Sequence, residues 1–147
     1  MLVRDFQPTD QHDVVRLWGR CTLTRPWNDP VVDIKRKLDG QPDWLLVAVD
    51  ESGIVGSVMV GYDGHRGWIN YLAVDPERQR AGIGRELMLE AERRLFDKGC
   101  PKINLQIRDD NHNAILFYES IGFSRDPVAS FGKRLIPDTS REIPDGG

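Results

Sequence analysis

One short segment carries residues whose types and spacing suit the binding of a phosphate group. It runs Val74-Asp-Pro-Glu-Arg-Gln-Arg-Ala-Gly-Ile-Gly-Arg85 and joins an apolar stretch to a long amphipathic one. The first N–H groups of a helix lack internal partners and lie at the positive end of the helix dipole, and glycines let a ligand approach the backbone closely. The segment is therefore a candidate cradle for a diphosphate, with Arg80 and Arg85 at its rim. The alternative is a glycine-rich turn that only packs a helix against a strand.

Two familiar phosphate motifs do not fit this segment. A P-loop needs Lys and then Ser or Thr directly after its last glycine, but Arg85 and Glu86 stand there. The dinucleotide-binding fingerprint needs a third Gly or Ala, at the position that Leu87 occupies. Both motifs are excluded, so the segment must belong to another kind of phosphate site if it binds phosphate at all.

The elements that position this segment follow from the spacing of apolar residues. One helix is predicted over 82–98 and another over 111–121, each closed by a glycine. Two earlier helices are expected, one that Asp10 would cap and one over 31–38. Strands are predicted over 2–6, 44–49, 54–62, 68–74, 102–108 and 123–136. This order predicts an α/β (α+β) fold with an antiparallel meander in the middle, and not a regular Rossmann alternation.

Length and composition bound the class of protein. The chain has 147 residues, enough for one domain, and its 20 Lys and Arg against 23 Asp and Glu give a net charge of -3. We expect no nucleic-acid partner from such a balance. Two cysteines exclude a disulfide framework and a cysteine-rich zinc site, and no metal is expected. The longest apolar run, 44–49, is too short to span a bilayer and the start is charged, so a cytoplasmic protein without membrane association is expected.

Two blocks of sequence carry a resemblance to a known family. Gln79-Arg80-Ala81-Gly82-Ile83-Gly84 reads Q/R-x-x-G-x-G/A and resembles the acetyl-CoA signature of the GCN5-related N-acetyltransferase (GNAT) family. Asn111-His-Asn-Ala114, then Phe117-Tyr118-Glu119 and Gly122-Phe123, resembles that family's N-x-x-A-x-x-x-Y-E-x-x-G-F. The segments 25–30, 61–67 and 132–136 resemble the bacterial YpeA-type acetyltransferases. The resemblance implies a single GNAT-like domain over 1–136, with a mixed, mostly antiparallel twisted sheet flanked by helices. The segment 137–147 is polar and contains Pro and Gly, so a flexible tail is expected there.

The resemblance also implies roles for particular residues. Tyr118 would be the general acid that protonates the departing thiolate, although its helical spacing also suits a core aromatic. The backbone N–H near Leu72 would face the thioester oxygen and thus act in catalysis. Acetyl-CoA is the implied acyl donor. The implied CoA-binding residues are Leu72, Ala73, Val74, Gln79, Arg80, Ala81, Gly82, Ile83, Gly84, Arg85, Asn111 and Tyr118.

The general base and the acceptor site stay open at this point. Many relatives carry a glutamate where this chain has Trp68-Ile-Asn-Tyr71. A water chain, Asp63, His65 or an amine of lower pKa could replace it. Trp27 and Asp29 are the candidate acceptor residues, because they lie in a loop between the first two helices. Asp29 could attract an ammonium group, or it could simply cap the next helix.

The function that this resemblance implies is an N-acetyltransferase. It would move an acetyl group from acetyl-CoA to a primary amine of a small molecule or peptide, directly and within a ternary complex. The alternative on the same fold is a non-catalytic acyl-CoA-binding sensor or regulatory module. A homodimer is possible through the exposed edge of the last strand.

Overall fold

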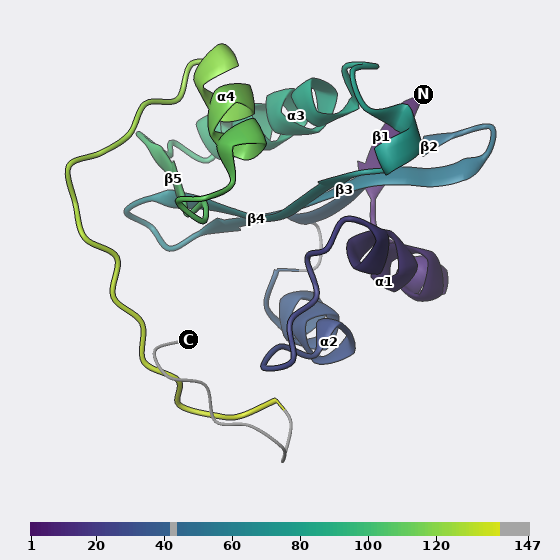
Figure 1. Cartoon of the computed structure of the whole chain (residues 1–147), viewed down its shortest axis with the longest axis horizontal. Helices are drawn as coiled ribbons and strands as arrows, with labels where there is room; N and C mark the ends of the chain where they lie inside the picture. Colours follow the sequence, from purple (N-terminus) through teal and green to yellow (C-terminus); the bar gives the residue numbers. More distant parts are fainter. Residues whose placement is uncertain (42–43, 139–147) are drawn as a thin grey trace.

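A single five-stranded sheet organises the molecule. The computed structural model describes residues 1–41 and 44–138, and its strands are arranged in the order β1-β2-β3-β4-β5 (Figure 1). Neighbouring strands are antiparallel, except that β5 runs parallel to β4. This confirms the mixed, mostly antiparallel sheet. The strands are β1 (Leu2–Asp5), β2 (Leu45–Asp50), β3 (Gly53–Tyr62), β4 (Gly67–Val74) and β5 (Ile103–Leu105).

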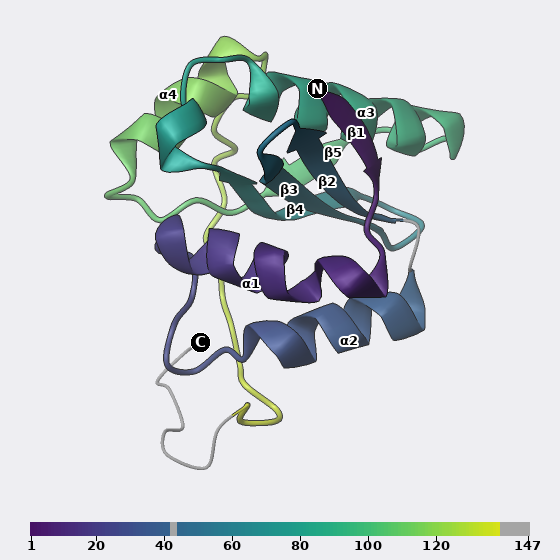
Figure 2. The same ribbon diagram turned by 90° about the vertical axis from the view of Figure 1, so that its right-hand side faces the viewer.

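Helices cover both faces of the sheet and so form three layers (Figure 2). On one face lie α1 (Gln11–Arg20) and α2 (Pro30–Gly40). On the other face lie α3 (Ile83–Asp97) and α4 (His112–Ser120). Two short 3-10 turns, η1 (Pro8–Asp10) and η3 (Pro76–Arg78), lead into α1 and toward α3.

The hydrophobic core is divided by the sheet into two clusters. Successive side chains of a strand point to opposite faces, so Leu45 of β2 joins the cluster under α1 and α2 while Leu46 joins the other. Trp18 of α1 and Leu87 of α3 are fully buried at the centres of these two clusters. The sheet is therefore held rigidly from both sides, which fixes the positions of groups at its edges.

Strands β4 and β5 diverge along their length. They pair only from Gly67 opposite Ile103 to Ile69 opposite Leu105. Beyond that point β5 ends, whereas β4 continues to Val74 in its pairing with β3. The backbone of β4 beyond Ile69 thus has an edge that no strand covers, and this opening lies beside the start of α3 and of α4 (Figure 1).

A β-bulge interrupts β4 at this opening. Ser57 lies opposite Ala73 and Met59 opposite Asn70, so Val58 faces two residues of β4, Tyr71 and Leu72. The extra residue reverses the alternation of side chains. Ile69 and Leu72 pack into the cluster under α3, whereas Tyr71 packs into the cluster under α1.

One predicted element is wrong, because no strand forms over 123–136 in the described part of the chain. The segment runs beside β5 (Figure 1), and side chains make its hydrogen bonds to residues 102–106. Asp126 accepts hydrogen bonds from Lys102 and Asn104, and Gln106 donates one to Ser130. Pro127 has no N–H to donate, and the apolar residues do not keep a strict alternation, so a ladder has little support. The predicted strand 102–108 is likewise reduced to 103–105.

The C-terminal segment then crosses to the opposite layer. Arg134 donates to the side chain of Asn28 at 2.8 Å, and Asp138 accepts from the backbone N–H of Asp29 at 2.9 Å. Of the predicted flexible tail, 137–147, only Pro137 and Asp138 are among the described residues. Within 1–41 and 44–138 no helix is long and apolar enough to cross a bilayer, and no group of three or more His, Cys, Asp or Glu could hold a metal ion.

Candidate active site

A large groove follows the opening between β4 and β5. Its volume is about 1340 Å³, and it extends from the start of α3, past the bulge of β4, to α2. Seven basic residues line it, namely Arg20, Arg25, Arg36, Lys37, Arg80, Arg85 and Arg108. In the part of the chain that is described, Asp33 is the one acidic residue in this lining. Although the chain is acidic overall, the groove is suited to an anionic ligand.

The N-terminus of α3 opens into this groove. Gly82 is the N-cap residue with φ +80°, and no side chain caps the helix. The first bond of the helix is donated by Glu86 to the carbonyl of Gly82, at 3.0 Å, so the amides of residues 83–85 have no partner within the helix. Arg80, two residues before the N-cap, has a left-handed backbone conformation with φ +69°, so the chain turns sharply just before the helix begins. Such a run of free amides at the positive end of a helix binds phosphate oxygens.

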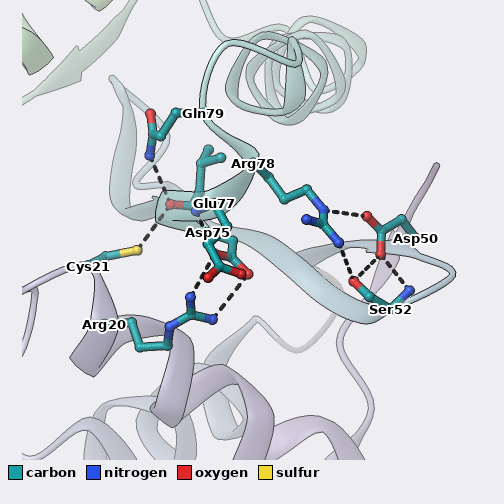
Figure 3. Close-up of polar contacts among 9 residues, drawn as sticks. Arg20, Cys21, Asp50, Ser52, Asp75, Glu77, Arg78 and Gln79 are labelled. Atoms are coloured by element: carbon teal, nitrogen blue, oxygen red, sulfur yellow. Dashed lines mark hydrogen bonds and ion pairs between the residues drawn. The ribbon is translucent and has the colours of Figure 1, made fainter.

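Four arginines lie in or beside this loop, and only two of them are free to meet a ligand. Arg80 and Arg85 are exposed in the groove lining and form no hydrogen bond or ion pair within the described residues. In contrast, Arg78 is held by Asp50 at 3.0 Å, and Arg20 forms a double contact with Asp75 (Figure 3). Arg78 and Arg20 thus anchor the loop, whereas Arg80 and Arg85 point their charge into the groove lining.

Gln79 and Cys21 meet at the carbonyl of Val74. The Gln79 side chain donates to this oxygen at 3.0 Å and the Cys21 thiol at 3.2 Å (Figure 3). Gln79, predicted as a CoA-binding residue, therefore holds the loop against the end of β4. Burial raises the pKa of the Cys21 thiol, which does not favour the thiolate that a covalent nucleophile needs.

Packing against α4 favours a glycine at position 84. A Cβ at this position would lie 3.1 Å from Cζ of Phe117, on the inner side of the contact between α3 and α4. At Gly82 a Cβ would meet nothing within 4 Å, but the φ of +80° favours glycine. The two glycines of the signature thus serve different purposes: one shapes the turn and one lets the helices approach.

The bulge of β4 is held by a buried chain of hydrogen bonds. The indole N–H of Trp18 donates to the hydroxyl of Ser57 at 2.8 Å, and this hydroxyl donates to the carbonyl of Tyr71 at 3.0 Å. Because that carbonyl is fixed on the α1 side, the backbone around Leu72 is fixed on the groove side. Leu72, Ala73 and Val74 all line the groove, as a strand that pairs with an extended ligand would.

Tyr118 of α4 lines the groove and is largely buried. The residue is 9% exposed, and its ring makes edge contacts with Phe117 and Phe123. Among the described residues, Nε of Arg134 is the one fully buried side-chain nitrogen or oxygen without a partner. The Tyr118 hydroxyl, which has no hydrogen bond there, is therefore accessible from the groove. Burial raises the pKa of Tyr118, so this hydroxyl stays protonated at neutral pH.

Comparison with known proteins agrees with this geometry. Residues 12–123 match the Acetyltransferase (GNAT) family. The chain belongs to this family. It is 48% identical over 139 residues to an acetyltransferase of Sodalis glossinidius, covering 94% of this chain and 98% of that relative. An acetyltransferase of Yersinia enterocolitica is 46% identical over 138 residues, with the same coverage of both chains. The protein is therefore a bacterial-type GNAT acetyltransferase.

Solved structures share the GNAT fold of this acetyltransferase. Ard1 of Thermoplasma volcanium superposes with a TM-score of 0.73 at 27% identity, covering 84% of this chain and 82% of that one. Naa20 of Chaetomium thermophilum, solved with a bisubstrate analogue, gives 0.69 at 28% identity and covers 84% and 71%. An aminoglycoside acetyltransferase from an uncultured soil sample gives 0.71 at 25% identity and covers 92% and 96%.

Three further site residues expected from the sequence have structural partners in this GNAT fold. The side chain of Asn111 accepts from the N–H of Ala114 and so caps α4 at the edge of the groove. Asp29 caps α2 through Val31 N–H at 2.9 Å, so the capping alternative is the one that the structure shows. Trp27 lies under the guanidinium of Arg108, 5.9 Å from the ring centroid.

Sequence reasoning missed Asp33, one turn after Asp29 on α2. Asp33 lines the groove and accepts a hydrogen bond from the hydroxyl of Tyr71 at 2.6 Å. The signal that could have found it is the spacing of four residues from the cap, which places both carboxylates on one side of α2. The base candidates that the sequence did suggest, Asp63 and His65, lie in the turn between β3 and β4 and not in the groove lining.

Proposed function

We propose that this GNAT acetyltransferase uses acetyl-CoA to acetylate a primary amine of a small molecule or peptide, by direct transfer within a ternary complex. The observation that carries the proposal is the continuity of the groove. It connects the free amides of α3, the bulge of β4 and the Tyr118 hydroxyl with a second side formed by α2. Donor and acceptor can thus be bound together on opposite sides of one reacting centre.

The donor side suits CoA because it combines a binding site for a diphosphate with a strand edge for an extended arm. The amides of residues 83–85, with Arg80 and Arg85, would hold the pyrophosphate. The uncovered edge of β4 over Leu72–Val74 would pair with the amides of the pantetheine arm. The backbone N–H near Leu72 would then meet the thioester oxygen as a fixed hydrogen-bond donor.

Tyr118 supplies the proton that the leaving sulfur needs. Acetyl-CoA provides the activated acyl group, and its thiolate leaves when the amine attacks. A phenol whose pKa is raised by burial stays protonated until the thiolate forms nearby. Its accessible hydroxyl and rigidly packed ring meet the requirement for a positioned acid.

Direct transfer is favoured over an acyl-enzyme. The thiol in the groove, Cys21, is bound to the carbonyl of Val74 and has a raised pKa. The crystallised complex of the similar Naa20 with a bisubstrate analogue supports simultaneous binding of the two substrates. The similar aminoglycoside acetyltransferase supports a small-molecule amine as one acceptor class.

The test is a screen of amines with detection of free CoA thiol at saturating acetyl-CoA. The panel contains short peptides with a free N-terminus, polyamines and aminoglycosides, and a reaction without amine measures hydrolysis. Thiol release that depends on one class of amine, with an acetylated product of the expected mass, supports the proposal. Tight binding of acetyl-CoA without turnover on any amine would instead support a sensor.

A further inference from the structure

The hydroxyl of Tyr71 and the carboxylate of Asp33 form a pair on the side of the groove opposite α4. Tyr71 lies in the bulge of β4 with φ +50°, and its hydroxyl is 2.6 Å from Oδ2 of Asp33 on α2. Both residues line the groove. The pair is thus built from two separate layers of the fold, and it lies in the same groove as the reacting centre proposed above.

We propose that Asp33 binds the ammonium group of the acceptor and removes its proton, and that Tyr71 positions Asp33 for this task. The inference rests on the proposed function, since it assigns the acceptor half of the same groove. Asp33 would be a catalytic residue and Tyr71 a positioning residue. The ligand class is a primary amine that arrives as an ammonium ion.

Charge in the groove singles out Asp33. Within the described residues it is the one acid in a lining that also holds seven basic residues, so it is the one side chain there that offers a negative charge to an ammonium group. The two neighbouring carboxylates, Asp29 and Asp138, already accept hydrogen bonds from other groups of the chain. Asp29 caps α2, and Asp138 is bound by the backbone N–H of Asp29 and by Arg36.

The two oxygens of Asp33 differ in how firmly they are held. Tyr71 binds Oδ2 at 2.6 Å, whereas Oδ1 forms a long ion pair of 3.5 Å with Nη1 of the exposed Arg36, which an incoming ammonium group can replace. The Asp33 side chain is 23% exposed, so an ammonium group can reach it. Burial, followed by the Asp33 hydrogen bond, raises the pKa of Tyr71, and the hydroxyl therefore remains a donor that holds Oδ2.

Tyr71 is in turn fixed from two directions. Its ring stacks on Trp18 with the centroids 3.8 Å apart, and its carbonyl is held by Ser57. The carboxylate is therefore oriented by a phenol that has little freedom to move. The stretch Trp68–Tyr71 of β4 lacks the glutamate that many relatives carry. In this arrangement the carboxylate comes from α2 instead.

The proton balance of the step is complete. The ammonium gives one proton to Asp33 and becomes a neutral amine, whose lone pair forms the C–N bond to the acetyl carbon. The C–S bond breaks, and the sulfur takes the proton of Tyr118. The nitrogen then loses its second proton, which restores Tyr118, and Asp33 releases its proton to water. No oxidant, reductant or further reactant is needed.

A pair of CoA derivatives tests the proposal without knowledge of the natural acceptor. S-aminopropyl-CoA carries an ammonium group on a short chain from the sulfur, and S-butyl-CoA is its uncharged isostere. Calorimetric titration gives the ratio of their affinities for each protein variant. We expect the wild-type chain to prefer the ammonium compound by about tenfold or more, as for a charge-assisted hydrogen bond in a sheltered site. We expect Asp33→Asn to abolish this preference while its affinity for S-butyl-CoA stays the same.

Controls separate this inference from the proposed function. Asp39→Asn, on the same helix but paired with the exposed Lys35, should keep the wild-type preference. If S-butyl-CoA does not bind the wild-type chain, the proposed function itself fails. If it binds but the preference is absent, or is equal in wild type and Asp33→Asn for aminoethyl, aminopropyl and aminobutyl chains alike, the Asp33 assignment is overturned.

Tyr71→Phe tests the positioning role. The ring and its stacking on Trp18 are kept, and only the hydrogen bond to Asp33 is removed. The preference for the ammonium compound should fall severalfold but not vanish, with unchanged binding of S-butyl-CoA. A full wild-type preference in Tyr71→Phe would show that Asp33 needs no positioning by this hydroxyl.

Discussion

The indole ring of Trp18 lies flat on the phenol ring of Tyr71, with the centroids 3.8 Å apart and the planes 11° from parallel. One residue belongs to α1 and the other to the bulge of β4, so this contact joins a helix of one layer to the irregular backbone of the sheet. The same indole reaches the Tyr71 carbonyl through Ser57. The shape of the groove at its centre is therefore set by a residue that does not line it.

Ser57→Ala should reveal this connection. The fully buried N–H of Trp18 would lose its acceptor, and we expect a loss of about 1–3 kcal/mol in the free energy of unfolding. Because the bulge would also lose its anchor, kcat should fall more than the affinity for acetyl-CoA. Urea unfolding and steady-state kinetics measure the two effects, with Ser124→Ala, an exposed residue after α4, as the control. A variant with wild-type stability and kcat would mean that the hydrogen bonds of Ser57 are not needed to hold the bulge.

Arg80→Gln and Arg85→Gln should weaken acetyl-CoA binding without loss of stability. Each removes one exposed positive charge that has no partner in the described structure. We expect the double variant to bind acetyl-CoA roughly tenfold more weakly than the wild-type chain. Its affinity should also depend less on the salt concentration. Calorimetric titration at two salt concentrations gives both values. Arg93→Gln, at the outer side of α3 and paired with Glu90, is the control; an equal loss there would point to a general charge effect.

Gly84→Val should be costly to the fold itself. The new side chain would collide with Phe117, and overpacking of this kind costs about 1–3 kcal/mol. Phe117→Leu in the same chain should recover part of the loss. Gly19→Ala is the contrasting variant, since Gly19 lies inside α1 with nothing within 4 Å of a Cβ, and it should stabilise the fold by up to about 1 kcal/mol. Urea unfolding that ranks these variants differently would contradict the packing argument.

Stability should rise with pH in the range where Lys37 titrates. Burial lowers the pKa of Lys37 from 10.5 to about 8, while its Nζ donates to Val60 and Gln41. Between about pH 8 and 10.5 the unfolded chain holds more protons at this site, so the free energy of unfolding increases as pH rises through that window. Below it both states are protonated and the burial penalty is constant.

Lys37→Met isolates this contribution. Its urea midpoint should lack the part of the pH dependence that Lys37 supplies, whereas Lys35→Met, with an exposed side chain on the same helix, should keep it. Unfolding curves at pH values below, inside and near the top of the window provide the comparison. Parallel pH profiles of wild type and Lys37→Met would show that the pKa of Lys37 is not lowered.

Local patterns predicted most of the fold because each such element is stabilised by its own apolar face. The helix after the phosphate-binding turn is an example: Leu87, Ala91 and Leu95 recur at helical spacing and are all buried. The predicted strand over 123–136 did not form, although β5 ends the sheet and its outer edge has no partner strand within 1–41 and 44–138. Pro127 has no N–H to donate and the apolar residues around it do not alternate strictly, so the segment is held beside β5 by side chains instead.

A structural feature of the candidate site could be predicted where one segment supplies all of it, and was missed where two distant segments meet. The uncapped start of α3 follows from Gly82 and its neighbours alone. In contrast, the contact between Asp33 and Tyr71 joins residues 38 positions apart and depends on the bulge of β4. A bulge of one residue leaves no clear mark in the alternation of an apolar strand, so the side on which Tyr71 lies could not be foreseen.

Tyr118→Phe tests the central claim most directly, that the groove is a catalytic site in which Tyr118 protonates the leaving thiolate. The variant keeps the ring packing against Phe117 and Phe123, so the melting temperature and the affinity for acetyl-CoA should be unchanged. We predict a fall in kcat of about 10²-fold, which corresponds to about 2.7 kcal/mol of lost transition-state stabilisation. Tyr118→Ala, by comparison, should also lower the stability through the cavity that it leaves. If Tyr118→Phe retains close to the full kcat with an accepted amine, Tyr118 is a packing residue and the proton comes from elsewhere.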